Sequence, residues 1–298
     1  MPNKLTDSEM SALEAALKIC ADEPIHLVGT IQPVGVMLAV DCETLLVRAA
    51  SQNLQIIFPD VADMAIGMPL RDLIGEDQAV WVETLIGLGH WTGAKVWSVS
   101  LPFKGEIRQY DAQVFLSGEL FVIEIEFSQP SSGDVFHNLF IPVRDALWKL
   151  DSETDLGRYA QLSVEQVRAL TGFDRVMMYR FDSNWDGEVI AESKSEGADS
   201  YLGNRFPASD IPPQARALYT KNLVRVISDV NAESIPLRSA SAQTPAQSID
   251  LSHSWLRSMS PVHVEYLRNM GVCASLSISL VQNDRLWGLI ACHHMTPR

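Results

Sequence analysis

Short apolar segments separated by turn residues are the feature of this sequence that most restricts its fold. In the first half of the chain they are 34–40, 45–49, 94–101, 110–116 and 119–127. All are far shorter than the ~20 apolar residues that a membrane-spanning helix needs. Helical patterns interrupt them at 70–74 and 80–86, where Gly87 and Gly89 are placed to end a helix. This order predicts a small antiparallel sheet with helices on one side.

The second half of the chain predicts another sheet domain, which begins with helices. Apolar residues at 139, 143, 146, 147 and 150 form one helical stripe. The segment 152–155 resembles a capping box that starts a further helix, and Gly172 is placed to end it. We expect strands at 175–181, 188–192, 274–280 and 285–293. We expect helices from about 213 and at 261–270. The fold class is therefore α+β, with two antiparallel-sheet domains and flanking helices.

Composition limits the kind of protein that this chain can be. A length of 298 residues fits about two domains, and a net charge of −14 argues against nucleic acid or an anionic membrane as partner. Four cysteines are too few for a disulfide scaffold, and the polar amino terminus is no signal peptide. We expect a soluble cytoplasmic protein with reduced thiols, a linker at 129–134 and an exposed loop at 239–250.

The segment 206–212 places one carboxylate, Asp210, between prolines and apolar residues. Pro212 biases Ile211 toward an extended conformation, and a buried carboxylate is costly unless a donor meets it. His263 and His293 could join Asp210 in a polar constellation suited to a ligand with N–H groups. The alternative is a loop aspartate in an Asx-type turn, with two ordinary histidines.

The segment 274–280 alternates apolar residues with serines, as a strand with two different faces does. Ser275, Ser277 and Ser279 share one face. They either meet water or line the polar side of a ligand pocket. If the strand extends back far enough, Cys273 shares their face. It is then either a second thiol near the ligand or a plain buried cysteine.

Several long motifs, in a fixed order from about Cys20 to Pro297, resemble those of bacteriophytochromes. The first is Cys20 followed by Glu-Pro-Ile-His at 23–26 and Gly-Thr-Ile-Gln-Pro-Val-Gly at 29–35. The others are FPASDIPPQARALYTKNLVR, LRSMSPVHVEYLRNMGV and LWGLIACHH. The resemblance implies an amino-terminal arm at 1–23, a PAS domain at 24–128 and a GAF domain at 135–298 that lacks its closing helix.

What the resemblance implies about function is a red and far-red light photoreceptor module, a sensor rather than an enzyme. Its cofactor would be biliverdin, a linear tetrapyrrole held through a thioether at Cys20, and light would isomerise one bilin double bond. Plant and cyanobacterial phytochromes use a cysteine just before the GAF histidine, but Val262 occupies that position here. The alternative to a pigment-attachment site is that Cys20 is only a small residue in the packing of a helix.

The resemblance also assigns pocket roles to individual residues. Asp210, with Ile211 and Pro212, would lie beside the pyrrole rings; His263 would lie above the central rings, and His293 would contact the isomerising ring, with His294 turned away. Arg225 and Arg257 would bind propionates. The remaining pocket residues implied are Tyr179, Phe206, Tyr219, Tyr266, Ser260, Ser275 and Ser277.

The same resemblance implies contacts between parts of the chain and with other domains. We expect a figure-of-eight knot, in which the amino-terminal segment passes through a GAF loop that includes 239–250. A homodimer through the GAF helices is compatible with the family. A PHY domain and an output module such as a histidine kinase would follow in the full-length chain.

Two other functions compete with the photoreceptor. The first is a PAS–GAF module that binds a different small ligand, such as haem or a nucleotide, which an absorbance spectrum would distinguish. The second is a metallohydrolase that uses Asp210, His263, Cys292 and His293. Strand alternation places Cys292 and His293 on opposite faces, and no HExxH or paired CxxC motif supports a metal site. We therefore expect no metal.

Overall fold

The computed structural model of the protein describes residues 23–89, 93–103, 106–127, 140–239 and 245–298. They form two compact units, each discontinuous in sequence. The first unit contains the described residues of 26–138 and 227–259; the second contains those of 139–226 and 260–298, with 23–25. The predicted arm with Cys20, the linker at 129–134 and residues 240–244 of the predicted loop lie outside these ranges. No helix within them is long and apolar enough to cross a membrane.

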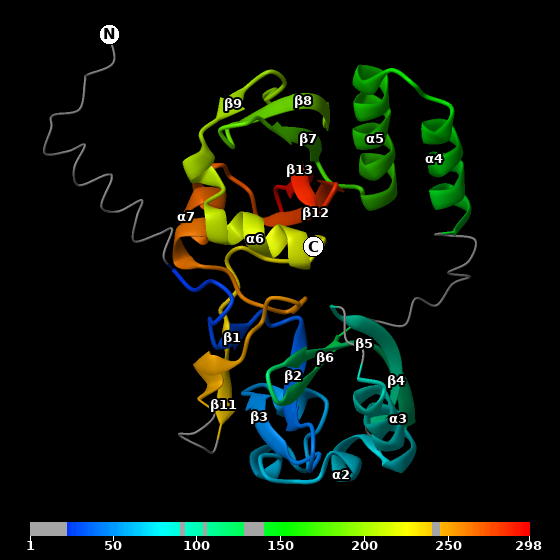
Figure 1. Cartoon of the computed structure of the whole chain (residues 1–298), viewed down its shortest axis with the longest axis vertical. Helices are drawn as coiled ribbons and strands as arrows, with labels where there is room; N and C mark the ends of the chain where they lie inside the picture. The colour runs from blue at the N-terminus through cyan, green and yellow to red at the C-terminus, as the bar shows by residue number, and fades with distance from the viewer. Residues whose placement is uncertain (1–22, 90–92, 104–105, 128–139, 240–244) are drawn as a thin grey trace, which may run out of the picture. The chain divides into compact units, whose positions relative to one another are not determined.

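The described strands of the first unit form one sheet in the order β1-β11-β3-β2-β6-β5-β4 (Figure 1). The strands are β1 (Thr30–Ile31), β2 (Gly35–Asp41), β3 (Val47–Ser51), β4 (Lys95–Phe103), β5 (Glu106–Ser117), β6 (Leu120–Glu126) and β11 (Ile235–Ser239). All neighbouring strands are antiparallel. The strands predicted from the apolar segments are confirmed, with their ends moved by a few residues.

Helices cover one face of this sheet. They are η1 (Leu54–Ile56), η2 (Ala62–Met64), α2 (Leu70–Ile74) and α3 (Glu76–Gly87). Leu70 and Val82 pack with Leu38 of β2 in one continuous core. Because strand residues alternate between faces, Met37 and Ala39 point the other way. The predicted sheet with helices on one side is confirmed.

The opposite face of the first sheet is covered by 227–259, a segment inserted between two parts of the second unit. Its short helix η5 (Ala246–Ser248) and the residue Ile249 belong to a second core with Met37. The prediction that 239–250 is an exposed loop is therefore wrong for Ala246 and Ile249, which are 6% and 1% exposed. These apolar side chains are buried because the sheet offers an apolar face that would otherwise meet water.

Strand β1 is hydrogen-bonded on both edges by the inserted segment 227–259. One edge pairs with β11. On the other edge Gln32 N donates to Leu256 O, and Ser258 N donates to Thr30 O. Strand β1 is therefore bonded to the inserted segment 227–259, as the predicted knot requires. Passage of the chain through a closed loop stays a prediction.

The second unit contains a six-stranded sheet in the order β10-β12-β13-β7-β8-β9 within the described residues. The strands are β7 (Arg175–Phe181), β8 (Gly187–Lys194), β9 (Arg205–Phe206), β10 (Val224–Ile227), β12 (Ala274–Gln282) and β13 (Arg285–His294). The helices are α4 (Ile141–Asp151), α5 (Leu156–Thr171), η4 (Ala208–Asp210), α6 (Pro213–Lys221) and α7 (Pro261–Asn269). The strands and helices predicted here are confirmed, and the fold class is α+β.

Helix α5 covers one face of the second sheet, and α4 packs beside α5 (Figure 1). Asp155 caps α5 by accepting a hydrogen bond from Arg158 N, and Gly172 ends it with a positive φ of 68°. Ala160 and Val164 of α5 pack against strand residues of the sheet in one apolar core. The predicted stripe of α4 is less buried than its pattern indicated, because Leu147 is 60% exposed.

A buried carboxylate fastens the inserted segment to the first sheet. Glu124 of β6 is 1% exposed. It accepts hydrogen bonds from Ser254 Oγ, from Trp255 N at 2.7 Å and from Gln113 Nε2 at 3.3 Å. These donors offset the cost of burying the charge, and they hold 254–256 in one position on the sheet.

We predict that Glu124→Ala lowers the free energy of unfolding by about 3 kcal/mol, because it leaves buried donors without their acceptor. Urea unfolding measures the loss. Glu119→Ala is the control, since Glu119 is exposed in the β5–β6 turn and its loss should cost less than about 0.5 kcal/mol. Equal losses in the two variants would contradict this account of Glu124.

Candidate ligand-binding site

The candidate site lies on the face of the second sheet that α5 does not cover. The strand register sets three parallel rows of side chains across β12, β13 and β7. The rows are Ser275–His293–Arg175, Ser277–Ala291–Met177 and Ser279–Leu289–Tyr179. Because alternate residues share a face, these rows contain no residue of the core under α5.

The serines on this face are withdrawn from solvent. Ser275 is 5% exposed and Ser279 is 9% exposed, while Ser277 is half-buried. Ser279 Oγ is buried and has no hydrogen-bond partner among the residues that the structure describes. A buried hydroxyl without a partner is costly, so a ligand that hydrogen-bonds on this face would be stabilised there.

Aromatic side chains form a wall next to the serine rows. Tyr179 packs edge-on against Phe181, with ring centroids 5.2 Å apart, and lies 6.0 Å from Phe206. Tyr219 of α6 is half-buried against the same group. Gly187 is required here, because a Cβ at that position would fall 1.7 Å from the Tyr179 ring. The wall therefore depends on the absence of a side chain at Gly187.

Asp210 ends the short helix η4, between Pro207 and Pro212, which are both extended. Ile211 leaves the helical region with ψ 84°, as a residue before proline prefers. Arg216 Nη1 donates to Ala208 O and Ile211 O and so braces the turn. The predicted proline-fixed turn is present, and it directs the carboxylate toward Tyr266.

The carboxylate of Asp210 and the phenol of Tyr266 form a polar pair, in which Tyr266 Oη donates to Asp210 Oδ2 at 3.4 Å. Burial raises the pKa of Asp210, and the hydrogen bond from Tyr266 lowers it by a smaller amount. Burial and the nearby carboxylate raise the pKa of Tyr266 to about 12. Burial also raises the pKa of Tyr179, and Asp210 adds to that rise. Within the pair the phenol donates and the carboxylate accepts, and the second carboxylate oxygen of Asp210 is able to accept from a ligand.

Helix α7 brings His263 to the same region. Ser260 caps this helix by accepting a hydrogen bond from His263 N at 3.3 Å, and Pro261 occupies its first turn. The His263 and Tyr266 rings are stacked, with centroids 6.3 Å apart. The structure thus links Ser260, His263, Tyr266 and Asp210 in one chain of contacts.

His293 is a buried polar residue of the serine face, in one row with Ser275 and Arg175. It is 7% exposed, and its Nδ1 atom has no hydrogen-bond partner within the described ranges of the chain. Burial lowers the pKa of His293 to about 4, with smaller contributions from Arg175 and His263. The imidazole is therefore neutral near pH 7 and keeps one donor and one acceptor.

The neighbours of His293 in the chain point to the other face. His294 Nδ1 lies 2.9 Å from Asp174 Oδ2, and its ring packs on Phe173. Cys292 is buried in the core under α5, where burial raises the pKa of its thiol to about 12. The prediction that Cys292 and His293 face opposite ways is confirmed. Among the described residues, no three metal-binding side chains gather around one point.

The remaining predicted site residues lie in different places. Arg225 of β10 is 9% exposed in the second unit. Arg257 belongs to the first unit, where it is 8% exposed and its backbone N donates to Ser254 Oγ. Cys273 is half-buried, and its N donates to His294 O. Cys20 lies outside the described residues.

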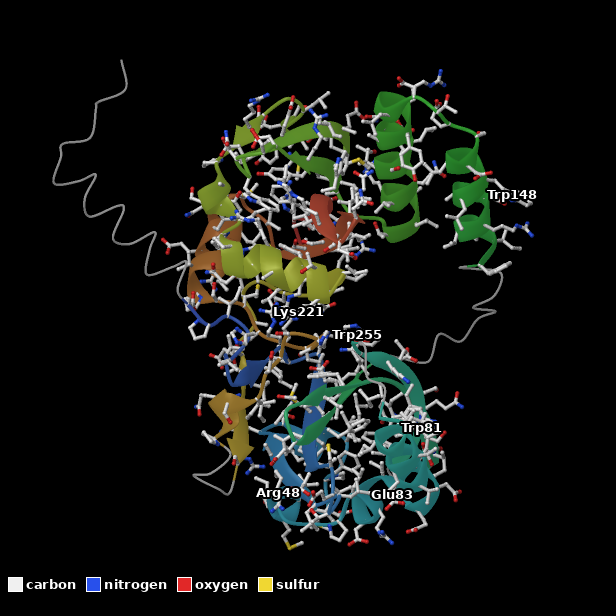
Figure 2. The ribbon with its side chains drawn as sticks, in the orientation of Figure 1. Arg48, Trp81, Glu83, Trp148, Lys221 and Trp255 are labelled. Atoms are coloured by element: carbon white, nitrogen blue, oxygen red, sulfur yellow. The ribbon has the colours of Figure 1, made fainter. Side chains whose placement is uncertain are left out.

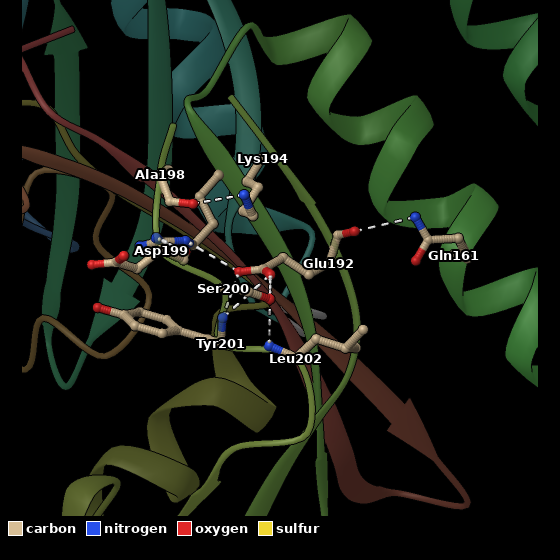
Figure 3. A network of polar contacts seen from close by, with 9 residues as sticks. Gln161, Glu192, Lys194, Ala198, Asp199, Ser200, Tyr201 and Leu202 are labelled. Carbon is tan, nitrogen blue, oxygen red and sulfur yellow. Dashed lines mark hydrogen bonds and ion pairs between the residues drawn. The ribbon is translucent and has the colours of Figure 1, made fainter. Parts of the chain in front are cut away.

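Sequence reasoning missed Arg175, Glu192 and Tyr201, which contact one another on this face of the sheet. Figure 3 shows Glu192 and Tyr201. The sequence indicates Arg175 only in that a charged residue begins the otherwise apolar strand β7. Strand periodicity alone cannot identify its neighbour, because the register between strands is not visible in one sequence.

Comparison with known proteins gives matches over both halves of the chain. Residues 20–128 match the family described as the PAS fold, and 155–298 match the family described as the GAF domain. Cyanobacterial phytochrome B of Nostoc sp. is 38% identical over 282 residues, which are 95% of this chain and 38% of that protein. A bacteriophytochrome of Pseudomonas aeruginosa is 38% identical over 290 residues, 97% of this chain and again 38% of that protein.

Among solved structures, the chromophore-binding domain of Stigmatella aurantiaca phytochrome P1 superposes with a TM-score of 0.84. It is 38% identical, and the match covers 94% of this chain and 92% of that one. The chromophore-binding domain of an unusual R. palustris bacteriophytochrome has a TM-score of 0.81 at 35% identity, covering 94% and 90%. The chain thus spans about two fifths of the curated relatives and nearly all of these chromophore-binding domains.

We predict that Asp210→Asn changes how stability depends on pH. Because the folded state raises the pKa of Asp210 above 3.8, it binds more protons than the unfolded state, and stability falls as pH rises through that window. The melting temperature of Asp210→Asn relative to the unaltered protein should therefore increase from about pH 4 upward and then level off. Tyr266→Phe removes a hydrogen bond that lowers this pKa, so the fall should extend to higher pH.

Melting temperatures between about pH 3 and 8 measure these differences. Asp284→Asn is the control, since Asp284 is exposed in the β12–β13 turn. A difference between Asp210→Asn and the unaltered protein that does not vary with pH would show that Asp210 ionises as freely in the folded state as in the unfolded one.

Proposed function

Since this chain belongs to the phytochrome family and contains the PAS and GAF parts of its photosensory region, we propose that it binds biliverdin covalently and senses red and far-red light. The observation that carries the proposal is a face of the second unit that has an aromatic wall and two buried polar atoms, His293 Nδ1 and Ser279 Oγ, with no hydrogen-bond partner in the described part of the chain. A linear tetrapyrrole has ring N–H groups, carbonyls, propionates and flat apolar rings. The buried polar atoms of this face suit the bilin carbonyls, and its aromatic wall suits the flat rings.

The proposed contacts follow from the chemistry of each side chain. Arg225 and Arg257 bind the propionates, because a guanidinium donates two parallel hydrogen bonds to a carboxylate. Ser275 and Ser277 add neutral donors from β12. Asp210 and His263 lie beside the ring nitrogens. The remaining proposed contacts are Ile211, Pro212, Tyr179, Phe206, Tyr219, Tyr266 and Ser260.

The bilin, when bound, supplies the absorption of red light and the isomerisation of one double bond. The protein's part is to hold it and to control its protons. Asp210 and Tyr266 provide an acceptor and a donor within one pair. His293 provides a neutral imidazole for a ring carbonyl. The aromatic wall excludes water, and the resulting low dielectric strengthens these hydrogen bonds.

Attachment through Cys20 is the most specific part of the proposal. Val262 stands where a GAF cysteine would serve. Cys292 is excluded, because its thiol is fully buried on the wrong face. Cys273, half-buried directly before β12, is the alternative thiol.

Signalling requires partners beyond this chain. We propose that a PHY domain and an output region of the full-length protein receive the signal, as the partial coverage of longer relatives suggests. A homodimer through the GAF helices is supported by apolar side chains left exposed on α4 and α5. Trp148 is 64% exposed and points away from α4 in Figure 2, and Leu147 and Leu156 are 60% and 53% exposed.

We predict that Cys20→Ser abolishes covalent attachment of biliverdin. The unaltered protein mixed with biliverdin should give a band with zinc-induced fluorescence on a denaturing gel, and Cys20→Ser should give none. Cys42→Ser and Cys273→Ser should keep the band. Loss of the band in Cys273→Ser, with full retention in Cys20→Ser, would assign the linkage to Cys273 instead.

We predict that Asp210→Ala and His263→Ala assemble with pigment but respond differently to light. Asp210→Ala should photoconvert poorly and fluoresce more, because the acceptor beside the ring nitrogens is lost. His263→Ala should move the pigment's titration closer to neutral pH. Red-light difference spectra and absorbance titrations measure both effects, and Asp284→Ala is the exposed control. Simple loss of pigment uptake, or unchanged photochemistry and titration, would contradict these roles.

A further inference from the structure

A buried ion pair lies on the ligand-binding face of the second sheet and has no role in the contacts proposed above. Arg175 Nε of β7 lies 3.2 Å from Glu192 Oε1 of β8, and both side chains are 4% exposed. Buried ion pairs are seldom net stabilisers, because removing two charges from water offsets their attraction. A second role for this pair is therefore worth seeking.

The surroundings of the pair fix Arg175 in one orientation, and Figure 3 shows Ser200 and Tyr201 beside Glu192. Its Nη2 atom donates to Asp199 O, and its guanidinium lies 4.1 Å from the centre of the Tyr201 ring. Glu192 in turn accepts from Tyr201 N at 3.0 Å and from Ser200 Oγ at 2.5 Å. The guanidinium thus cannot turn away without breaking several interactions at once.

Arg175 faces His293. The two residues are direct partners in the antiparallel β7–β13 pair, so their side chains leave the same face. Cβ atoms of such partners lie about 4.5–5.5 Å apart. A fixed cation at this position disfavours a second positive charge on the imidazole. Burial is the largest cause of the low pKa of His293, and Arg175 is the next.

The other groups around His293 do not reverse this effect. Ser275, its partner on β12, is neutral. His263 of α7 acts in the same direction as Arg175 and more weakly. The Asp174 carboxylate, which could favour a charged imidazole, is paired with His294 on the opposite face. Arg175 is therefore the principal charge that acts on His293 in the described part of the chain.

We propose that the Arg175–Glu192 pair controls the charge state of His293. Glu192 holds the guanidinium of Arg175 in place, and the guanidinium keeps the imidazole uncharged. His293 then presents one donor and one acceptor to its ligand at neutral and mildly acidic pH. This inference rests on the proposed function for the identity of the ligand, but the state of the imidazole is a property of the protein alone. Arg175 and Glu192 are positioning residues and need not touch the ligand.

A purely structural role for the pair predicts something different. In that case Glu192 and Arg175 only tie the segment 198–202 to the sheet. Their loss would lower stability without changing the titration of His293. The two roles are separated by a measurement on the imidazole itself.

The experiment is a ¹⁵N NMR titration of the histidine side chains in the pigment-free protein, with His293 assigned by the signal missing from His293→Gln. In the unaltered protein His293 should stay neutral from pH 8 to about pH 5, as its pKa of about 4 requires. A charged His293 at pH 6 would overturn the proposal even if no variant folded.

Variants test the cause of that neutrality. Arg175→Met should raise the pKa of His293 by about one unit, because the neighbouring cation is gone while burial remains. Arg175→Lys keeps the charge and should leave most of the neutrality intact. Glu192→Gln keeps the cation without its counter-charge, so the imidazole should remain neutral to still lower pH. An unchanged titration in a folded Arg175→Met protein would refute the proposal.

Arg175→Met leaves Glu192 buried without its partner, and this variant could fail to fold. The double variant Arg175→Met/Glu192→Gln removes both charges and avoids that penalty, and it should still raise the pKa of His293, by less than Arg175→Met does because the carboxylate is also gone. No rise in the double variant would also refute the proposal. Because all titrations use pigment-free protein, failure of biliverdin binding would refute the proposed function without affecting this result.

Discussion

The two-residue period of the antiparallel strands in the second unit determines which side chains can meet one ligand. It sends Ile290, Cys292 and His294 toward the α5 side and His293 to the opposite face. The β12–β13–β7 register then sets Ser275, His293 and Arg175 in one row. A slip of one residue would exchange the two faces, which would bury the serines in an apolar core and remove the polar side of the site.

Much of the fold could be predicted because local patterns agree with tertiary packing. Alternation at 274–280 gave β12 and its serine face, and Gly172 ended α5 where a positive φ was needed. The loop at 239–250 was mispredicted, since its Ser-, Ala- and Pro-rich composition hides Ile249, a single apolar anchor 1% exposed. Its burial depends on the apolar face of a sheet more than a hundred residues earlier in the chain, which no local pattern reveals.

The site was predictable where residues close together in the sequence fix the local backbone conformation. Prolines around Asp210 fixed a turn, and the structure brings its carboxylate to Tyr266. The Arg175–Glu192 pair and the close approach of Gly187 to the Tyr179 ring were not predictable, because both depend on the register between strands. The inserted segment shows the same dependence, since Glu124 is buried only because residues 254–256 supply its donors.

In the proposed function, one face of the second sheet forms the polar and aromatic side of a biliverdin pocket. The most direct test is the absorbance spectrum of the purified protein mixed with biliverdin, before and after red light. We expect a strong red absorption band that differs from that of free biliverdin and decreases reversibly on red illumination. A spectrum identical to that of free biliverdin, unchanged by light, would contradict the proposed function.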